Sequence, residues 1–396
     1  MRGKQFERSR WTRLLRHAAV ILAVMLAAGT LFVWSGVYNV AASDDHWALT
    51  NWLIERVRVR SVATWSAFVD APPPLEDPDL VGLGAAHFEG ACTPCHSRPG
   101  DPRNAIVAAM LPPPPPLSRS VPELDTSEIF WIVKHGLKFT AMPAWPSRQR
   151  DDEVWAVTAF LLRLPDMSQQ GYLEASGVTR AGGTPKSDAE LAQSNESLSL
   201  TECVRCHGDA SRPPLADLIP VLNGQPRAYL ERALDEYAAR QRESGIMQPV
   251  SSLLRPYERR RIAGWYAGLE APPKAREESR AMRAPAGNDR TADRSEAIER
   301  GRTLAHEGDR EQGLPPCLAC HAGRHPENFP TLAGQSAAYL ESQLRVFRGD
   351  ARNASGYGEI MTVVARRLTP RQIGDVARFF ASLPPGDAPA PAEHAR

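Results

Sequence analysis

The sequence has almost no net charge, few aromatic residues and no cysteine outside three short motifs. Of its 396 residues, 47 are basic and 46 are acidic, so the formal net charge is +1. This balance argues against a nucleic-acid-binding protein, which needs a strongly basic footprint. Aromatic residues make up 7% of the chain, prolines number 35, and little of the sequence alternates like a half-buried strand. These features predict several small helical domains joined by proline-rich linkers.

All six cysteines lie in three copies of one pentapeptide, Cys-x-x-Cys-His. The two thiols of such a motif can add across the vinyl groups of a porphyrin, and the histidine then becomes the proximal ligand of the iron. The sequence therefore predicts three covalently bound haem c groups. The predicted attachment residues are Cys92, Cys95, Cys203, Cys206, Cys317 and Cys320, and the predicted proximal ligands are His96, His207 and His321.

Other uses of a Cys-x-x-Cys pair fit this chain poorly. A zinc site needs four ligands close together, but successive pairs begin at Cys92, Cys203 and Cys317, more than 100 residues apart. A thioredoxin-like pair would open a helix in a βαβ unit, for which strands are lacking. A structural disulfide would not require the histidine. Three copies that use every cysteine favour haem attachment.

A methionine follows each motif histidine at a similar distance, which is 46 residues in the first repeat and 40 in the other two. An aromatic residue follows each methionine by 18 residues and a leucine follows by 22. A thioether can fill the sixth position of the iron, and a six-coordinate iron passes electrons without binding a substrate. Met110, 14 residues after His96, is an alternative to Met142. The expected distal ligands, each on a loop before a final helix, are Met142, Met247 and Met361; the aromatic residues are Phe160, Trp265 and Phe379, and the leucines are Leu164, Leu269 and Leu383.

The residues around these methionines predict where the final helices begin. Thr369 and Gln372 form a capping box in the third repeat. Three acids at residues 151–153 place negative charge in the first turn of the corresponding helix of the first repeat. The second repeat has Pro256 but no good cap side chain. Trp145, three residues after Met142, is either a hydrogen-bond donor to a haem propionate or a core residue.

The second and third repeats share a further segment. The segment from Gly224 to Leu230 matches that from Gly334 to Leu340, and each opens an amphipathic helix, expected at 228–241 and 338–348. All three repeats resemble class I cytochrome c domains, and residues 186–384 resemble the two-domain cytochrome c4 family. The first repeat, with its segment 133–145, resembles the cytochrome domain of membrane-anchored c-type cytochromes.

The resemblance implies all-helical domains, iron ligated by histidine and methionine, and electron transfer without substrate chemistry. The chain departs from the cytochrome c4 family at residues 271–294. That family has a short connection between its two domains, whereas this segment is a charged linker with three prolines. A close pair of second and third haems is therefore not expected from the sequence.

The N-terminal region predicts a membrane anchor. Six of the first sixteen residues are Lys or Arg, and residues 18–37 carry no charge. About 20 apolar residues span a bilayer, and the basic flank stays in the cytoplasm. The alternative is a signal peptide cleaved after Ala42. Residues 46–70 predict a helix with Trp and Arg, which either lies at the membrane surface or packs on the first haem domain.

The predicted fold is all-α, with one N-terminal transmembrane helix followed by three small helical cytochrome c domains. The function predicted is that of a periplasmic electron carrier, with no catalytic residue, anchored in the inner (cytoplasmic) membrane. Its expected partners are redox proteins: a dehydrogenase as donor, as in the three-haem subunits of membrane-bound alcohol and aldehyde dehydrogenases, and a small cytochrome or terminal oxidase as acceptor. A multihaem peroxidase with one open iron is the alternative. The predicted division is a basic tail 1–16, an anchor 17–37, a membrane-proximal segment 38–78, and cytochrome domains 79–166, 186–270 and 294–384.

Overall fold

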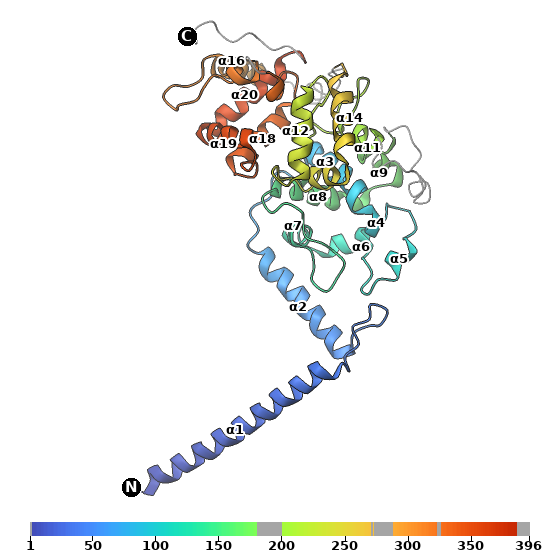
Figure 1. The fold of residues 1–396 in the computed structure, drawn as a ribbon, viewed down its shortest axis with the longest axis vertical. Coiled ribbons are helices and arrows are strands. Elements are labelled where there is room, and N and C mark those ends of the chain that lie inside the picture. Colours follow the sequence, from blue (N-terminus) through green and yellow to red (C-terminus); the bar gives the residue numbers. More distant parts are fainter. Residues whose placement is uncertain (1, 180–199, 271, 273–287, 323–325, 386–396) are drawn as a thin grey trace. The chain divides into compact units, whose positions relative to one another are not determined.

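The computed structural model describes residues 2–179, 200–270, 272, 288–322 and 326–385. Within these residues the regular structure consists of helices and two isolated β-bridges, and no strand is found (Figure 1). The predicted all-α fold is confirmed. The linker segments 180–188 and 271–287, the predicted start of the second domain at residue 186, and the tail from residue 386 lie outside the described residues.

The N-terminal helices carry exposed apolar side chains. Helix α1 (Arg2–Ser35) contains a 25-residue stretch, Trp11–Ser35, with a mean hydropathy of 2.2. By length and composition this stretch could cross a membrane. Helix α2 (Ala48–Ser66) lies within the helix expected at 46–70, and its side chains Trp52 and Trp65 are exposed. Helix α5 (Ala105–Ala108) is a single turn.

The helices of the first repeat surround an apolar core. Helix α3 packs along α8, and α7 packs against α8. Phe88 of α3 meets Phe160 of α8 with ring centroids 5.1 Å apart, and Phe130 of α7 stacks on Trp155 of α8 at 4.1 Å. The elements are α3 (Pro78–Ala91), α4 (Thr93–His96), α6 (Leu117–Ser120), α7 (Thr126–His135), α8 (Asp151–Arg163), α9 (Gln169–Ala175) and the 3-10 turns Val121–Glu123 and Leu164–Asp166.

The second repeat has a smaller described core, built around Leu230, Ile262 and the fully buried Tyr266. Tyr266 takes the innermost position that the sequence assigned to Trp265, which is half-buried. The expected lack of a helix cap at Pro256 is wrong, because the Glu258 carboxylate accepts the backbone N–H of Arg255 at 2.7 Å. The helices are α11 (Leu200–His207), α12 (Arg227–Ala238), α13 (Met247–Leu253) and α14 (Pro256–Ala267).

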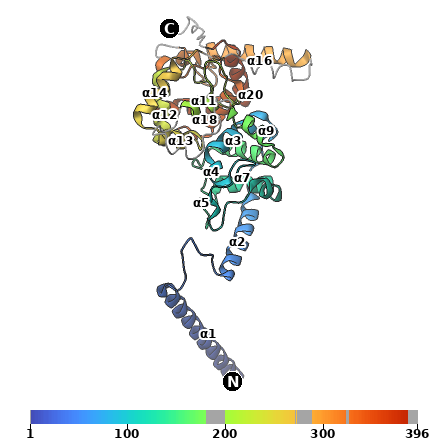
Figure 2. The ribbon, with the colours of Figure 1, turned by 90° about the vertical axis from the view of Figure 1, so that its right-hand side faces the viewer.

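In the third repeat, α16 and α20 pack side by side (Figure 2). The capping box predicted at the start of α20 is confirmed: Thr369 Oγ1 accepts from the Gln372 N–H at 3.2 Å, and Gln372 Oε1 accepts from the Thr369 N–H at 2.8 Å. Phe379 is buried in this core, as expected. The elements are α16 (Asn288–Glu307), α17 (Leu318–His321), α18 (Ala337–Arg348), α19 (Gly356–Arg367), α20 (Pro370–Ser382) and the 3-10 turn Pro326–Asn328.

Two glycines let an early helix cross the last helix of its repeat at close range. A Cβ at Gly84 of α3 would lie 2.0 Å from the carbonyl oxygen of Ala156 in α8. A Cβ at Gly301 of α16 would lie 2.1 Å from the carbonyl oxygen of Asp375 in α20. Side chains do not tolerate such distances, so only glycine permits this approach. The first and third repeats are thus built around the same crossing.

Replacing Gly301 by alanine is therefore expected to destabilise the third domain by about 1–3 kcal/mol, because backbone would have to move. Gly356→Ala is the control, since a Cβ there meets no atom within 4 Å. Both variants gain the same helix propensity. Denaturant unfolding of the full-length protein in detergent, followed by circular dichroism, would compare them. Equal midpoints for the two variants would contradict the crossing argument.

Candidate haem sites

Each Cys-x-x-Cys-His motif lies on a short helix. Cys92 directly follows α3 and the rest of the first motif forms α4, the second motif ends α11, and Cys317 precedes α17. All six thiols are free; five are half-buried and Cys320 is exposed. Burial raises the pKa of Cys92 and of Cys203 to about 12, so the unmodified thiols are neutral.

The three motif histidines share one hydrogen bond, which the sequence analysis missed. The Nδ1 atom of each faces the carbonyl oxygen of a proline. A donor role for Nδ1 leaves the Nε2 lone pair free for iron and fixes the ring orientation. The pairs and their distances are His96 and Pro115 at 3.3 Å, His207 and Pro220 at 3.0 Å, and His321 and Pro330 at 2.9 Å.

Electrostatics also suits these histidines to iron. Burial lowers the pKa of His96, His207 and His321 below that of a free imidazole, and the proline carbonyls only partly oppose this. A neutral imidazole is the form that ligates a metal. The repeated donor geometry and the paired free thiols therefore fit a covalently attached haem at each motif.

The three predicted distal methionines lie in different local structures. Met142 is on the loop between α7 and α8, where it packs against the same apolar core as Cys92. The expectation of a loop is wrong for the other two. Met247 is the first residue of α13 and Met361 lies within α19, because serine side chains cap these helices: Ser244 Oγ accepts the Met247 N–H at 2.9 Å and Ser355 Oγ accepts the Gly358 N–H at 3.1 Å.

Two buried arginines lie among the aromatic residues of the second and third repeats. Arg242 stands over the Tyr237 ring at 4.6 Å, and Arg352 stands over the Phe347 ring at 4.2 Å. The buried Arg242 Nε has no hydrogen-bond partner. Burial and the neighbouring Arg242 lower the pKa of Arg352. Within the described residues no ion pair joins either arginine to an acid.

Buried guanidinium groups need an anion to stabilise them. Arg242 and Arg352 are thus the residues that would hold haem propionates. Sequence reasoning passed over them, although each follows the tyrosine of the shared segment, Tyr229 or Tyr339, by 13 residues. That equal offset was the available signal.

The second and third repeats exchange glutamine side chains. Gln225 Nε2 donates to the Thr331 carbonyl at 2.8 Å and its Oε1 accepts the Thr331 N–H at 2.9 Å. Gln335 makes the same pair of bonds to Val221, at 2.7 and 3.1 Å. Each glutamine thereby holds the backbone next to the proline that faces the other repeat's motif histidine. The charged linker between the repeats has not prevented this reciprocal contact.

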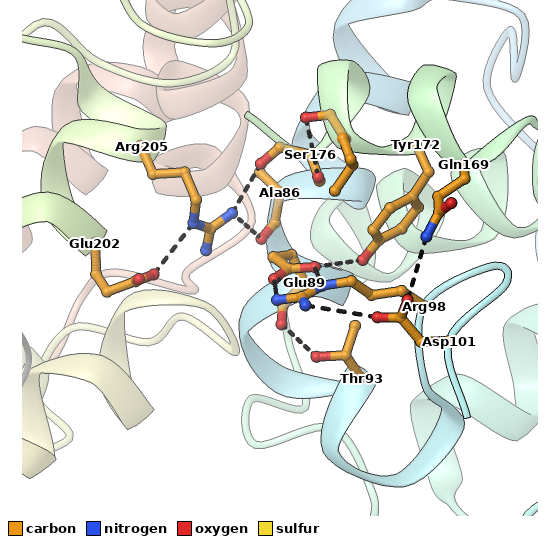
Figure 3. A network of polar contacts seen from close by, with 11 residues as sticks. Ala86, Glu89, Thr93, Arg98, Asp101, Gln169, Tyr172, Ser176, Glu202 and Arg205 are labelled. Atoms are coloured by element: carbon orange, nitrogen blue, oxygen red, sulfur yellow. Dashed lines mark hydrogen bonds and ion pairs between the residues drawn. The ribbon is translucent and has the colours of Figure 1, made fainter. Parts of the chain in front are cut away.

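The second motif also reaches into the first repeat. Arg205, between the two cysteines of that motif, donates from Nη1 to the carbonyl oxygens of Ala86 and Ser176, both at 2.9 Å (Figure 3). In the same network Glu89 accepts from the Tyr172 hydroxyl at 2.6 Å, and its backbone carbonyl accepts from the Thr93 hydroxyl of the first motif at 2.6 Å. The two motifs are therefore attached to the same helix, α3.

Trp145 is a core residue, and its indole N–H is not free for a haem propionate. It is 8% exposed, and its Nε1 donates to Glu153 Oε2 at 3.3 Å. Glu153, which the sequence placed in an exposed first turn, is itself buried and paired with Arg150.

Comparison with known proteins identifies the class of these sites. Residues 80–161 match the family model of cytochrome c oxidase, cbb3-type, subunit III. The thiosulfate dehydrogenase electron acceptor of Thiomonas intermedia is 32% identical over 185 residues, which cover 46% of this chain and 78% of that protein. Cytochrome c4 of Thiocapsa roseopersicina is 28% identical, covering 48% of this chain and 92% of that one.

Among solved structures, cytochrome c4 of Acidithiobacillus ferrooxidans is 25% identical, covers 46% of this chain and 98% of that one, and has a TM-score of 0.37. The Thiomonas protein is similar over most of its own length. The chain therefore belongs to the c-type cytochrome family that includes the thiosulfate dehydrogenase electron acceptors, and it is an electron-transfer protein with covalently bound haem c.

Proposed function

We propose that the chain is a membrane-anchored periplasmic cytochrome that binds three haem c groups, one in each of the domains 79–166, 186–270 and 294–384. The observation that carries the number three is the shared histidine geometry, since Nδ1 faces a proline carbonyl in every motif. The attachment residues are the six cysteines, and the axial ligands are His96 with Met142, His207 with Met247 and His321 with Met361.

A bound haem would accept and release one electron at its iron. The residues of the chain bind and orient this group. The proline carbonyls set the histidine rings, the methionine thioethers close the sixth position against substrates and raise the reduction potential, and Arg242 with Arg352 compensate propionate charge. Helix α1 would keep the carrier at the inner membrane, close to membrane-bound acceptors.

The partners we propose follow from the relatives. Proteins named thiosulfate dehydrogenase electron acceptors are similar to this chain over about 185 residues. A dehydrogenase that oxidises a small sulfur compound such as thiosulfate is therefore the favoured donor. The first domain matches a model named for an oxidase subunit, which favours a terminal oxidase or a small cytochrome as the acceptor.

The full-length protein, purified from membranes in detergent, is expected to hold three haems per chain that survive denaturation. Its oxidised spectrum should be low-spin at all three irons. Thiosulfate should reduce it only when a thiosulfate dehydrogenase is added. Haem content would come from the reduced pyridine adduct, measured against protein mass. Two or fewer haems, or a high-spin iron that quickly binds cyanide and turns over peroxide, would contradict the proposal and favour a peroxidase.

A further inference from the structure

The segment just before Met247 is held by the first domain. This segment, Glu243–Met247, is called the Met247 strap below. Its backbone carbonyl at Glu243 accepts from Arg150 Nη1 at 2.9 Å, and its Glu243 carboxylate accepts from the Ser147 hydroxyl at 2.6 Å. Ile246 packs against the apolar core of the first domain. The strap thus belongs in sequence to the second domain but is packed on the first.

The centre of this contact is the carboxylate of Glu153, which is 3% exposed. Glu153 Oε1 accepts from the Ser244 hydroxyl at 2.6 Å, and Oε2 accepts from the Gly245 N–H at 2.5 Å. Arg150 Nη1 forms an ion pair with Oε1 at 2.9 Å. A buried carboxylate with a cation and several donors is held firmly in one position.

The strap passes this restraint on to Met247. Ser244 Oγ donates to Glu153 and accepts the N–H groups of Ile246 and Met247 at 3.2 and 2.9 Å. The helix that begins at Met247 is therefore capped by a side chain that the first domain fixes. Trp145 adds a steric limit, because a Cβ at Gly245 would lie 2.0 Å from its Nε1.

The methionine segments of the two domains meet at this cluster. Trp145, Ser147 and Arg150 all lie in the eight residues that follow Met142, and Ser244 and Gly245 lie just before Met247. We propose that Glu153 is a positioning residue for Met247, so that the first domain controls the distal ligation of the second haem. This inference rests on the proposed function, in which Met247 ligates that haem.

Three variants of the full-length holoprotein test the inference. Met247→Leu removes the proposed ligand directly, and its spectrum identifies the second haem among the three. Glu153→Ala removes the anchor of the strap, and Ser244→Ala removes the link between Glu153 and the Met247 N–H. Glu153→Gln keeps the side-chain volume and one acceptor oxygen, which serves as a conservative variant if the alanine protein folds poorly.

The readouts are the sulfur-to-iron charge-transfer band of the oxidised protein and the low-spin signals in electron paramagnetic resonance. Met247→Leu should lower the band by about one third, since one haem of three would lose its thioether. Glu153→Ala and Ser244→Ala should shift the same resonance signal, and Glu153→Gln should shift it less. Glu258→Gln is the matched control, because Glu258 is also a buried carboxylate of a helix start but caps α14 inside the second domain.

The outcomes separate the inference from the proposed function. If Met247→Leu lowers the band but Glu153→Ala and Ser244→Ala leave that signal unchanged, Glu153 does not position the ligand. A shift of equal size in Glu258→Gln would indicate a general loss of packing and would also overturn the inference. If Met247→Leu itself changes nothing, the ligand assignment of the proposed function fails.

Discussion

A chain in which Cys203 and Cys206 are both replaced by serine is expected to carry two covalent haems and to lose electron transfer between its first and third domains. Without thiols the second haem has no covalent attachment. The second domain contacts both neighbours through side chains from its haem motif and from its shared segment, Arg205 and Gln225. No hydrogen bond or ion pair joins the first and third domains within the described residues, so the relay would have no direct alternative.

The matched control for this double variant is Cys317→Ser with Cys320→Ser. It also leaves two haems, but the first and second remain adjacent. Haem content would be measured per chain, and transfer between the remaining haems by rapid-mixing reduction. Equal transfer rates in the two double variants would contradict a central role for the second domain. The single variant Cys203→Ser should keep one thioether and three haems at lower yield.

The haem motifs and the helices could be predicted from the sequence because both depend on local chemistry. Two cysteines and a histidine in five residues form a site by themselves, and the capping box at Thr369 is satisfied within one turn. The contacts between domains could not be predicted in this way. The acids at the start of α8 suited an exposed first turn, but Glu153 turns inward because Arg150 and the strap donate to it.

The shared segment shows the same limit more sharply. Its glutamines, Gln225 and Gln335, were visible as a repeated feature at the start of two helices. Their role is to bind the backbone of the opposite repeat, and a sequence does not show which repeat lies opposite. Arg242 and Arg352 are likewise explained by an anion that the folded domains would bring to them. The sequence thus located residues of the sites but not the contacts between them.

Replacing Met142 by histidine is expected to lower the reduction potential of one haem while that haem stays low-spin. Imidazole donates more electron density to iron than a thioether and so stabilises the oxidised state. Axial ligands set haem potentials over about 0.8 V, so a decrease on the order of 0.1 V or more is expected. A potentiometric titration followed by absorbance would resolve one of three waves moving to lower potential.

Met110→Leu is the matched comparison, because Met110 is the other methionine considered for the first haem. Met142 packs on the same core as Cys92, whereas no such contact supports Met110. The expected result is that Met110→Leu leaves all three potentials and the charge-transfer band unchanged. If Met110→Leu instead weakens the band by about one third and Met142→His moves no wave, Met110 is the ligand. In that case the loop between α7 and α8 would serve only to hold Trp145 and Arg150 against the second domain.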